Sequence, residues 1–251
     1  MFKFIKNIST KTASRVDLVS VFGVKHILKT YDTTYSVALK EIRILKMCNH
    51  PNVIKYTEIL EPEPKCTIFI FALETRSLTD LIGNYYYDKW DIIRQIVEGL
   101  NYLHSNQILH LDFKTDNIMY TGGQIKIIDM GSSEIMVGES IEINCPKCTV
   151  THRPPEGYYH GVPIAINKHF DIWSLGIVIY EVLNDIPMYL CEFFPPYSSG
   201  ILDSVFEDAI RSDDFCRKIL EGIPFELYPC ININSLNRFN IETVKSILWF
   251  L

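Results

Sequence analysis

Apolar residues recur at helical spacing in several segments of this chain. Between residues 36 and 49 they fall at i, i+7, i+8 and i+11, which places them on one face of a helix. Residues 90–104 show a similar apolar face, formed by Ile93, Ile96, Val97, Leu100 and Leu103. Residues 171–183 are apolar almost throughout, a pattern typical of a helix that is buried on all sides. We therefore predict helices over these segments, and a shorter one over residues 77–82.

Strand patterns are concentrated in the first third of the chain. Residues 24–31 are predicted to form a strand that follows a turn at Phe22 and Gly23. Residues 66–71 form a short apolar run typical of a buried strand, whereas residues 5–24 alternate only weakly. Strand patterns thus come first along the chain and helix patterns afterwards.

The composition is that of a soluble globular protein. The chain has 251 residues, enough for one large domain or two small ones, with 47% hydrophobic and 22% charged residues. Its formal net charge of −6 argues against direct binding of nucleic acid and favours basic partners. The first residues lack the apolar core of a signal peptide, and no apolar run is long enough to span a membrane. We expect an intracellular protein, in the cytoplasm, the nucleus or both, and the sequence leaves its oligomeric state open.

Seven cysteines are scattered along the chain, an odd number that does not indicate a disulfide framework. Cys145 and Cys148 form a CxxC pair that could be half of a zinc site or a redox pair. No second CxxC or HxxxH pair lies near it in the sequence. Reduced thiols are therefore the expectation, and metal or redox chemistry at this pair is disfavoured.

The residue types needed for phosphoryl transfer lie close together in the middle of the chain. Asp112 could orient an attacking hydroxyl, and Lys114 could steady the transferred phosphoryl group. Asn117 and Asp129 provide oxygen atoms of the kind that Mg²⁺ prefers. The alternative is that these are turn and capping residues, since Asp and Asn in loops often bond the nearby backbone. Their spacing, between a predicted helix and a strand, favours the catalytic interpretation.

Residues 110–117 and 127–131 resemble the signature motifs of the eukaryotic-like protein kinase family. They match HxDxKxxN followed by DxG, with Leu111 in place of the usual Arg and Met130 in place of the usual Phe. The resemblance implies an α+β protein with a two-lobed kinase fold. Such a fold has a small β-rich N-lobe with one main helix and a larger, mostly helical C-lobe.

The resemblance also implies boundaries within a single kinase domain. The N-lobe would take about residues 1–70, the hinge residues 71–73 and the C-lobe about residues 74–251. Lys114 together with Thr149 resembles the serine/threonine branch, in which that Thr bonds the Asp and Lys of the catalytic loop. The compact length and divergent nucleotide loop resemble viral kinases, such as those of large insect DNA viruses of the baculovirus type.

The resemblance places a nucleotide site between the lobes. Lys29 ends the segment that matches the family's VAIK and would clamp the α- and β-phosphates of ATP. Lys25 is the alternative, but it would leave too short a hairpin after Val16. Glu41 lies inside the apolar stripe of residues 36–49 and would pair with Lys29, since an inward carboxylate needs a cation. The adenine ring would lie among Val16, Ile27, the gatekeeper Ile70, the hinge residues Phe71 and Leu73, and Met119.

The glycine-rich nucleotide loop of the family is not matched. If Val16 is the valine of GxGxxGxV, the glycine positions fall on Ser9, Lys11 and Ser14. Glycine lets backbone amides approach the phosphates, and side chains at these positions would hold the loop away. Serine hydroxyls or the Lys11 ammonium could make substitute contacts. This loop favours the rival interpretation, a pseudokinase that binds and regulates a partner.

Further motifs extend the resemblance towards the end of the chain. Residues 149–156 resemble TxxYRAPE, with His152 in place of Tyr, and residues 171–176 match DxWSxG. Arg238 lies in a segment that resembles the last family motif, whose Arg pairs with the Glu of APE. We therefore expect a buried ion pair between Arg238 and Glu156.

The resemblance implies an ATP- and Mg²⁺-dependent enzyme that phosphorylates Ser and Thr hydroxyls of protein substrates. It assigns Asp112 as base and Lys114 as the cation at the transferring phosphoryl, and it assigns Asn117 and Asp129 as Mg²⁺ ligands. A pseudokinase with weak or no phosphoryl transfer is the alternative. A small-molecule kinase of related fold is disfavoured by the activation segment and by Arg238.

Two acidic residues bear on the substrate. In kinases that prefer basic sequences, carboxylates at the positions of Asp116 and Glu181 face the residues before the acceptor. Substrates of this chain are therefore expected to be basic. The alternative is that Glu181 pairs with a neighbouring cation.

Leu111 bears on regulation. Many kinases use the Arg at this position to bind a phosphate on the activation segment, and a leucine side chain cannot do so. Phosphorylation of the activation segment is therefore not expected to be required for activity, a prediction that covers Ser132, Ser133 and Thr151.

Overall fold

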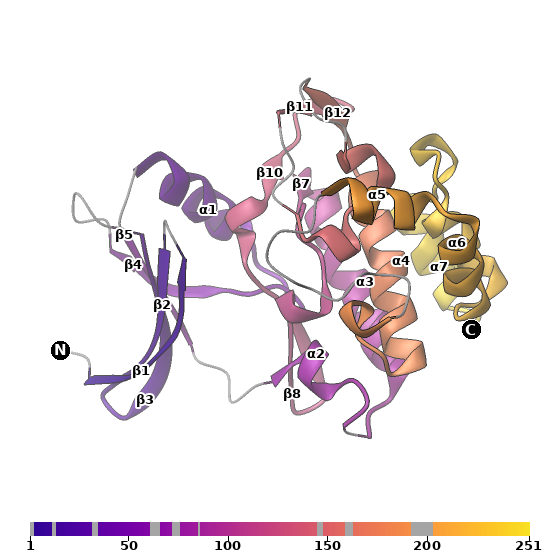
Figure 1. Cartoon of the computed structure of the whole chain (residues 1–251). Coiled ribbons are helices and arrows are strands. Elements are labelled where there is room, and N and C mark those ends of the chain that lie inside the picture. Colours follow the sequence, from indigo (N-terminus) through magenta and orange to yellow (C-terminus); the bar gives the residue numbers. More distant parts are fainter. Residues whose placement is uncertain are drawn as a thin grey trace.

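The protein is divided into a strand-rich and a helical part in the computed structural model (Figure 1). The structure describes residues 3–11, 14–31, 35–60, 66–71, 76–84, 86–144, 148–158, 163–191 and 203–251. These two parts agree with the predicted N-lobe and C-lobe. The hinge residue Leu73 lies outside the described residues.

A five-stranded antiparallel sheet, in the order β1-β2-β3-β5-β4, forms the N-lobe. Its strands are β1 (Lys3–Lys11), β2 (Ser14–Val21), β3 (Val24–Tyr31), β4 (Tyr56–Leu60) and β5 (Cys66–Phe71). The β2–β3 hairpin turns at Phe22 and Gly23, which both have positive φ, as a tight two-residue hairpin requires. The predicted strands over residues 24–31 and 66–71 are confirmed.

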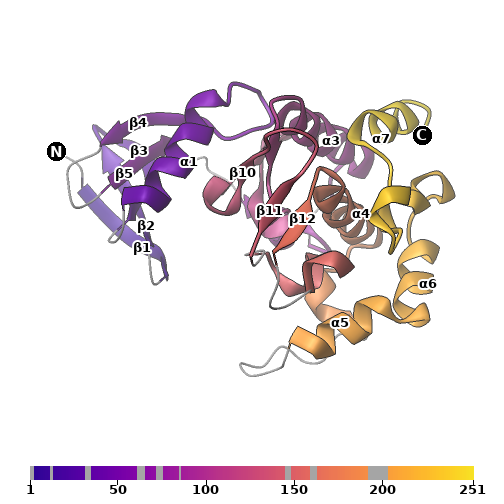
Figure 2. The same ribbon diagram turned by 90° about the horizontal axis from the view of Figure 1, so that it is seen from above.

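One helix, α1 (Tyr35–Met47), packs beside this sheet (Figures 1 and 2). Its inward side carries the apolar side chains of Ile44 and Leu45, each at most 1% exposed. Glu41 lies on the same side and is 2% exposed. The predicted helix with an inward carboxylate is therefore confirmed.

The C-lobe is built around α4 (His169–Asn184). Its side chains from Phe170 to Ile179 are all buried, because helices and 3-10 turns cover it on every side, as its apolar sequence predicts. The other helices are α2 (Leu78–Leu81), α3 (Lys89–Ser105), α5 (Asp203–Arg211), α6 (Asp213–Glu221) and α7 (Ile241–Leu248). In Figures 1 and 2 α3 runs beside α4, with α6 and α7 at the end of the molecule away from the sheet.

Short strands and 3-10 turns position the loops of the C-lobe. The strands are β6 (Arg76–Ser77), β7 (Ile108–Leu109), β8 (Ile118–Thr121), β9 (Gln124–Ile127), β10 (Glu134–Ile135), β11 (Ile141–Ile143) and β12 (Ile164–Ile166). The 3-10 turns are η1 (Thr115–Asn117), η2 (Met130–Ser132), η3 (Val150–His152), η4 (Pro155–Tyr158), η5 (Met188–Leu190), η6 (Phe225–Ile231) and η7 (Ser235–Asn237).

The β8–β9 hairpin brings the two predicted Mg²⁺ ligands together. Asn117 directly precedes β8, and Asp129 follows the end of β9 by two residues. The backbone N–H of Ile128 donates to the carbonyl of Asn117 at 2.9 Å, so the two chain segments stay side by side. The antiparallel pairing of β8 with β9 thus brings two residues that are 12 positions apart in the sequence into one site.

The described residues include no helix long and apolar enough to cross a membrane. In the CxxC pair, Cys145 lies outside the described residues, whereas Cys148 is buried. Burial raises the pKa of the Cys148 thiol to about 12, which keeps it protonated and unreactive at neutral pH. This protonation does not favour redox chemistry at the pair.

Candidate active site

Residues 110–117, which we call the catalytic loop, are held in place by Asp171 of α4. This carboxylate is fully buried and accepts hydrogen bonds from the backbone N–H groups of His110 and Leu111, at 2.8 and 2.9 Å. The ring nitrogen Nε2 of His104 lies 3.0 Å from the same carboxylate. Burial alone would raise the pKa of Asp171, but these partners outweigh it and the pKa lies below its ordinary value. The anchor holds Leu111 in a left-handed conformation, with φ of 63°.

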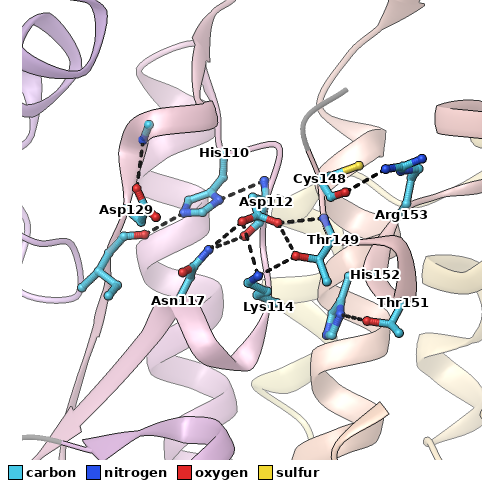
Figure 3. Close-up of polar contacts among 12 residues, drawn as sticks. His110, Asp112, Lys114, Asn117, Asp129, Cys148, Thr149, Thr151, His152 and Arg153 are labelled. Atoms are coloured by element: carbon cyan, nitrogen blue, oxygen red, sulfur yellow. Dashed lines mark hydrogen bonds and ion pairs between the residues drawn. The ribbon is translucent and has the colours of Figure 1, made fainter. Parts of the chain in front are cut away.

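Asp112 projects from this loop into a cluster of donors (Figure 3). Its Oδ1 accepts from the Thr149 hydroxyl at 2.7 Å and from the Thr149 backbone N–H at 2.9 Å. Its Oδ2 lies 3.2 Å from Asn117 Nδ2 and 3.6 Å from Lys114 Nζ. Burial would raise the pKa of Asp112, yet Lys114 and the Thr149 hydrogen bonds outweigh it and lower the pKa. The carboxylate is therefore ionised at neutral pH and oriented from several sides.

Lys114 lies beside the same carboxylate, where Figure 3 shows it below Thr149. Its Nζ donates to the Thr149 hydroxyl oxygen at 2.5 Å. A carboxylate and an ammonium group thus lie within a few ångströms of each other, with the Thr149 hydroxyl between them. An acceptor hydroxyl approaching Asp112 would meet a hydrogen-bond acceptor and a cation together, as phosphoryl transfer requires.

Lys29 links both lobes at the other side of the site. Its Nζ lies 2.9 Å from Glu41 Oε1 and 2.8 Å from Asp129 Oδ1. Burial would lower the pKa of Lys29, but the two carboxylates outweigh it and raise the pKa, so the ammonium stays charged. The predicted Lys29–Glu41 pair is confirmed. Asp129 has φ of 62°, and its Oδ1 also accepts from the Gly131 N–H at 3.3 Å.

The residues predicted to surround the adenine ring lie on adjacent strands. Val16 is paired with Lys29, and Ile27 is paired with Ile70. Directly opposed residues of antiparallel strands share a face, and residues two apart on a strand do so too, so Val16, Ile27 and Lys29 lie on one face of the sheet. Met119 lies on β8 of the C-lobe, paired with Ser77. The side chains of Ile70 and Phe71 and the whole of Leu73 lie outside the described residues.

The positions of the missing glycines lie near the tip of the β1–β2 hairpin. Ser9 is paired with Val16, and Lys11 is paired with Ser14. The tip residues 12–13 lie between Lys11 and Ser14. The hairpin therefore has the register that the alignment on Val16 requires. Its tip lies outside the described residues.

Asn117 and Asp129 fit a Mg²⁺ site that is completed by a nucleotide. The side-chain amide of Asn117 donates to Asp112, which leaves its oxygen as a metal ligand, and the side chain of Asp129 is 31% exposed. The described residues include no group of three or more His, Cys, Asp or Glu side chains that could hold a metal by themselves. One carboxylate and one amide oxygen match the few protein ligands that Mg²⁺ takes when phosphates supply the others.

The end of the activation segment is fastened to the C-lobe by Arg238. Its guanidinium forms two hydrogen bonds with Glu156, Nη1–Oε1 at 2.6 Å and Nη2–Oε2 at 2.8 Å. Its carbon Cζ also lies 5.1 Å from the centre of the Trp173 ring. The predicted ion pair is confirmed, with the Arg238 side chain fully buried and the Glu156 side chain 21% exposed. The bidentate geometry makes it a specific contact rather than a loose attraction.

Two hydroxyl groups of the activation segment, those of Ser133 and Thr151, are buried, whereas Ser132 is partly exposed. Ser133 is 0% exposed and donates to the carbonyl of His110, and Thr151 is 4% exposed and lies 3.0 Å from the His152 ring. Leu111 packs in an apolar cluster that also contains Met136, Cys148, Ile164, Ile166 and Phe170. Apolar packing therefore holds this part of the segment. It does so through Leu111, at the position where many kinases have a phosphate-binding Arg.

Glu181 does not face the substrate side, and the expectation for its position is wrong. It is 1% exposed, accepting from Thr115 Oγ1 at 3.0 Å and from the Met188 N–H at 2.6 Å. Nε2 of His152 lies 3.1 Å from the same carboxylate. A carboxylate buried in α4 needs such partners, and His152 provides one of them. The substitution of His for the family's Tyr was the signal in the sequence for this contact.

The fold and the site together define the class of the protein. A β-rich lobe carries the Lys29–Glu41 pair, and a helical lobe carries Asp112, Lys114 and two oxygen ligands. This arrangement is that of the protein kinase class.

Comparison with known proteins agrees with this class. The chain matches the protein kinase domain family over residues 9–194. It is 28% identical to calcium-dependent protein kinase 5 of Plasmodium falciparum, over 84% of this chain and 37% of that protein. It is 32% identical to myosin light chain kinase 3 of Pongo abelii, over 82% of this chain and 27% of that protein. A protein of Acanthamoeba polyphaga mimivirus, named as a serine/threonine-protein kinase, is 28% identical over 93% of this chain and 45% of its own length.

The chain belongs to the protein kinase family. It is similar to serine/threonine kinases, and it spans between 27% and 45% of the length of these relatives.

Proposed function

We propose that this chain transfers the γ-phosphoryl group of ATP to Ser and Thr hydroxyls of proteins. The observation that carries the proposal is the triple contact of Asp112, Thr149 and Lys114. In this arrangement an ionised carboxylate is aimed at the point where an acceptor hydroxyl would arrive, next to a cation. The likeness to serine/threonine kinases supports the same reaction.

Each residue has a separate task in the proposed reaction. Asp112 orients the acceptor hydroxyl and accepts its proton, while Lys114 steadies the transferring phosphoryl group. Lys29 binds the α- and β-phosphates and is itself held by Glu41. Mg²⁺ held by Asn117 and Asp129 would neutralise charge on the phosphates.

The pseudokinase alternative receives no support from the geometry of the described residues. Its sequence argument was the absence of glycines before Val16. Lys29 is nevertheless paired with Glu41 and Asp129, and Asp112 is ionised and oriented. A binding module would need none of these charges to be placed in this way.

The experiment that tests the proposal is transfer of labelled phosphate from ATP to a basic test protein, with the labelled amino acids then identified. We expect labelled Ser and Thr in the presence of Mg²⁺, and loss of labelling in Asp129→Asn, which keeps the size of the side chain but removes its charge. Labelled Tyr alone, or equal labelling by wild type and Asp129→Asn, would contradict the proposal.

We further propose that substrates carry basic residues before the acceptor, with Asp116 as the recognising carboxylate. Asp116 is exposed, and so is Asp80 on the adjoining helix α2. Thr79 and Thr115 precede these two residues, and their hydroxyls lie 2.9 Å apart, so the segments that carry the two exposed carboxylates lie side by side; we call these two residues the acidic surface. Because Glu181 is buried, the proposal rests on this surface alone.

Two peptides that differ only in Arg or Ala two and three positions before the acceptor Ser test this proposal. We expect a higher kcat/KM for the Arg peptide, and a preference that shrinks in Asp116→Ala and at high salt. Equal kcat/KM for the two peptides would exclude the basic preference. A preference that is unchanged in Asp116→Ala would place the recognition elsewhere.

An intracellular location, in the cytoplasm or nucleus, is also part of the proposal. The described cysteines, Cys48, Cys148, Cys191, Cys216 and Cys230, carry free thiols, as is common in reducing compartments. Microscopy of the tagged protein tests this location, and a secreted protein would contradict it.

A further inference from the structure

An ion pair ties α1 to the first strand of the activation segment. Lys40 Nζ lies 2.6 Å from Glu134 Oε1, and their side chains are 34% and 35% exposed. Lys40 directly precedes Glu41 in α1, and Glu134 begins β10. In Figures 1 and 2 α1 lies close to η2, the turn that leads from Asp129 into β10.

The two ends of this ion pair belong to the two halves of the active site. β10 pairs with β7, with Glu134 opposite Leu109, and β7 leads directly into the catalytic loop. Glu134 is therefore fixed relative to Asp112. On the other side, any rotation of α1 that moves Lys40 also moves Glu41, because the two residues are adjacent on one rigid helix.

We propose that the Lys40–Glu134 ion pair is a positioning element that holds α1 where Glu41 meets Lys29. In the proposal the Glu134 carboxylate is a permanent charge on the activation segment that attracts a cation of α1. Neither residue touches a substrate, so both act through the Lys29–Glu41 pair. The inference rests on the proposed phosphotransferase function, and it adds the means by which the active orientation is kept.

The arrangement around Leu111 supports this assignment. Apolar packing of Leu111 with Met136 and Phe170 fastens the activation segment to the C-lobe. These packing contacts all lie within the C-lobe. The Lys40–Glu134 pair extends the attachment across the lobe boundary to α1.

The expected effect is modest, because a partly exposed ion pair is weakened by solvent and by salt. We expect Lys40→Ala and Glu134→Ala each to lower kcat/KM by about two- to fivefold, within the range that such pairs support. The double variant should lose no more than either single one, since the interaction is gone after the first change. The effect should shrink at 1 M salt.

A charge reversal separates the ion pair from the individual residues. Lys40→Glu and Glu134→Lys should each impair transfer more than the alanine variants do, since each places two like charges side by side. Combining them should restore most of the activity. Arg43→Ala is the matched control, because Arg43 is an exposed cation one turn further along the same helix, and it should behave as wild type.

Hydrogen exchange of the α1 amides in the nucleotide-free protein provides a readout that does not depend on phosphoryl transfer. Exchange should be faster in both alanine variants and return towards wild type in the reversed pair. This result would hold even if the chain proved to transfer no phosphate, so failure of the proposed function and failure of this inference are distinguishable. Unchanged exchange and kcat/KM in the single variants, or a reversed pair as impaired as the single charge reversals, would overturn the inference.

Discussion

Replacement of Thr149 by Ala tests how the catalytic carboxylate is positioned. The Thr149 hydroxyl donates to Asp112 at 2.7 Å and accepts from Lys114 at 2.5 Å, so the substitution removes both contacts. The backbone N–H of residue 149 still donates to Asp112 at 2.9 Å. The carboxylate therefore loses one of its donors without becoming unpaired.

The size of the effect follows from these contacts. A hydrogen bond to a charged group contributes about 1.5–3 kcal/mol, and the remaining donors place this case at the lower end. A loss of about 1.5 kcal/mol corresponds to a roughly tenfold lower kcat. The KM for ATP should stay within about twofold of wild type, because Thr149 lies beside Asp112 and makes no contact with Lys29 among the described residues.

The pH dependence provides a second, independent readout. The hydrogen bonds from Thr149 are among the causes that lower the pKa of Asp112. Removing the hydroxyl should raise that pKa, so the acid limb of kcat should move to higher pH in Thr149→Ala. Near neutral pH the activity of the wild type should change little with pH through Asp112, because this carboxylate is already ionised there.

The assay measures kcat and KM for a Ser peptide across the acid and neutral range for wild type, Thr149→Ala and Thr149→Ser. The serine variant keeps a hydroxyl and should stay close to wild type in rate and in acid limb. If Thr149→Ala transfers phosphate as fast as wild type, with an unchanged acid limb, the positioning role of this hydroxyl is refuted.

Three other predictions follow from the site. Arg238→Ala should lower the free energy of unfolding by about 3 kcal/mol and the Tm by roughly 6–12 °C, because it strands a largely buried carboxylate; a Tm change below about 2 °C would count against this. Since buried Leu111 cannot bind a phosphate, phosphatase-treated protein should keep its activity, and a loss of more than about tenfold would contradict the prediction. Glycine at Ser9, Lys11 and Ser14 together should tighten ATP binding if the hairpin covers the phosphates, and an unchanged or weaker Kd would exclude that.

Much of the fold could be predicted because its elements have clear periods. The helix over residues 36–49 showed both an apolar stripe and an inward carboxylate, which indicated the need for a cation, and the family resemblance then named Lys29 as that cation. The strand over residues 66–71 has the predicted bounds. The Arg238–Glu156 pair followed from family motifs, since a separation of 82 positions leaves no local pattern to connect the two residues.

The features that escaped prediction have identifiable physical reasons. The strands β7 and β10 have two residues each, too few to show any alternation. Glu181 lies in a helix that is buried on every side, so its position in the sequence does not reveal which way it points. The Lys40–Glu134 pair joins residues 94 positions apart through tertiary packing alone.

Asp112 is the residue on which the proposed phosphoryl transfer depends, and Asp112→Asn removes its charge while keeping its size. Single-turnover transfer from ATP to a protein substrate should fall by about 10²–10⁴ in this variant, because both proton acceptance and orientation are lost. The Kd for ATP, measured on the same protein samples, should stay within a few-fold of wild type. Equal labelling of substrate by wild type and Asp112→Asn would contradict the account.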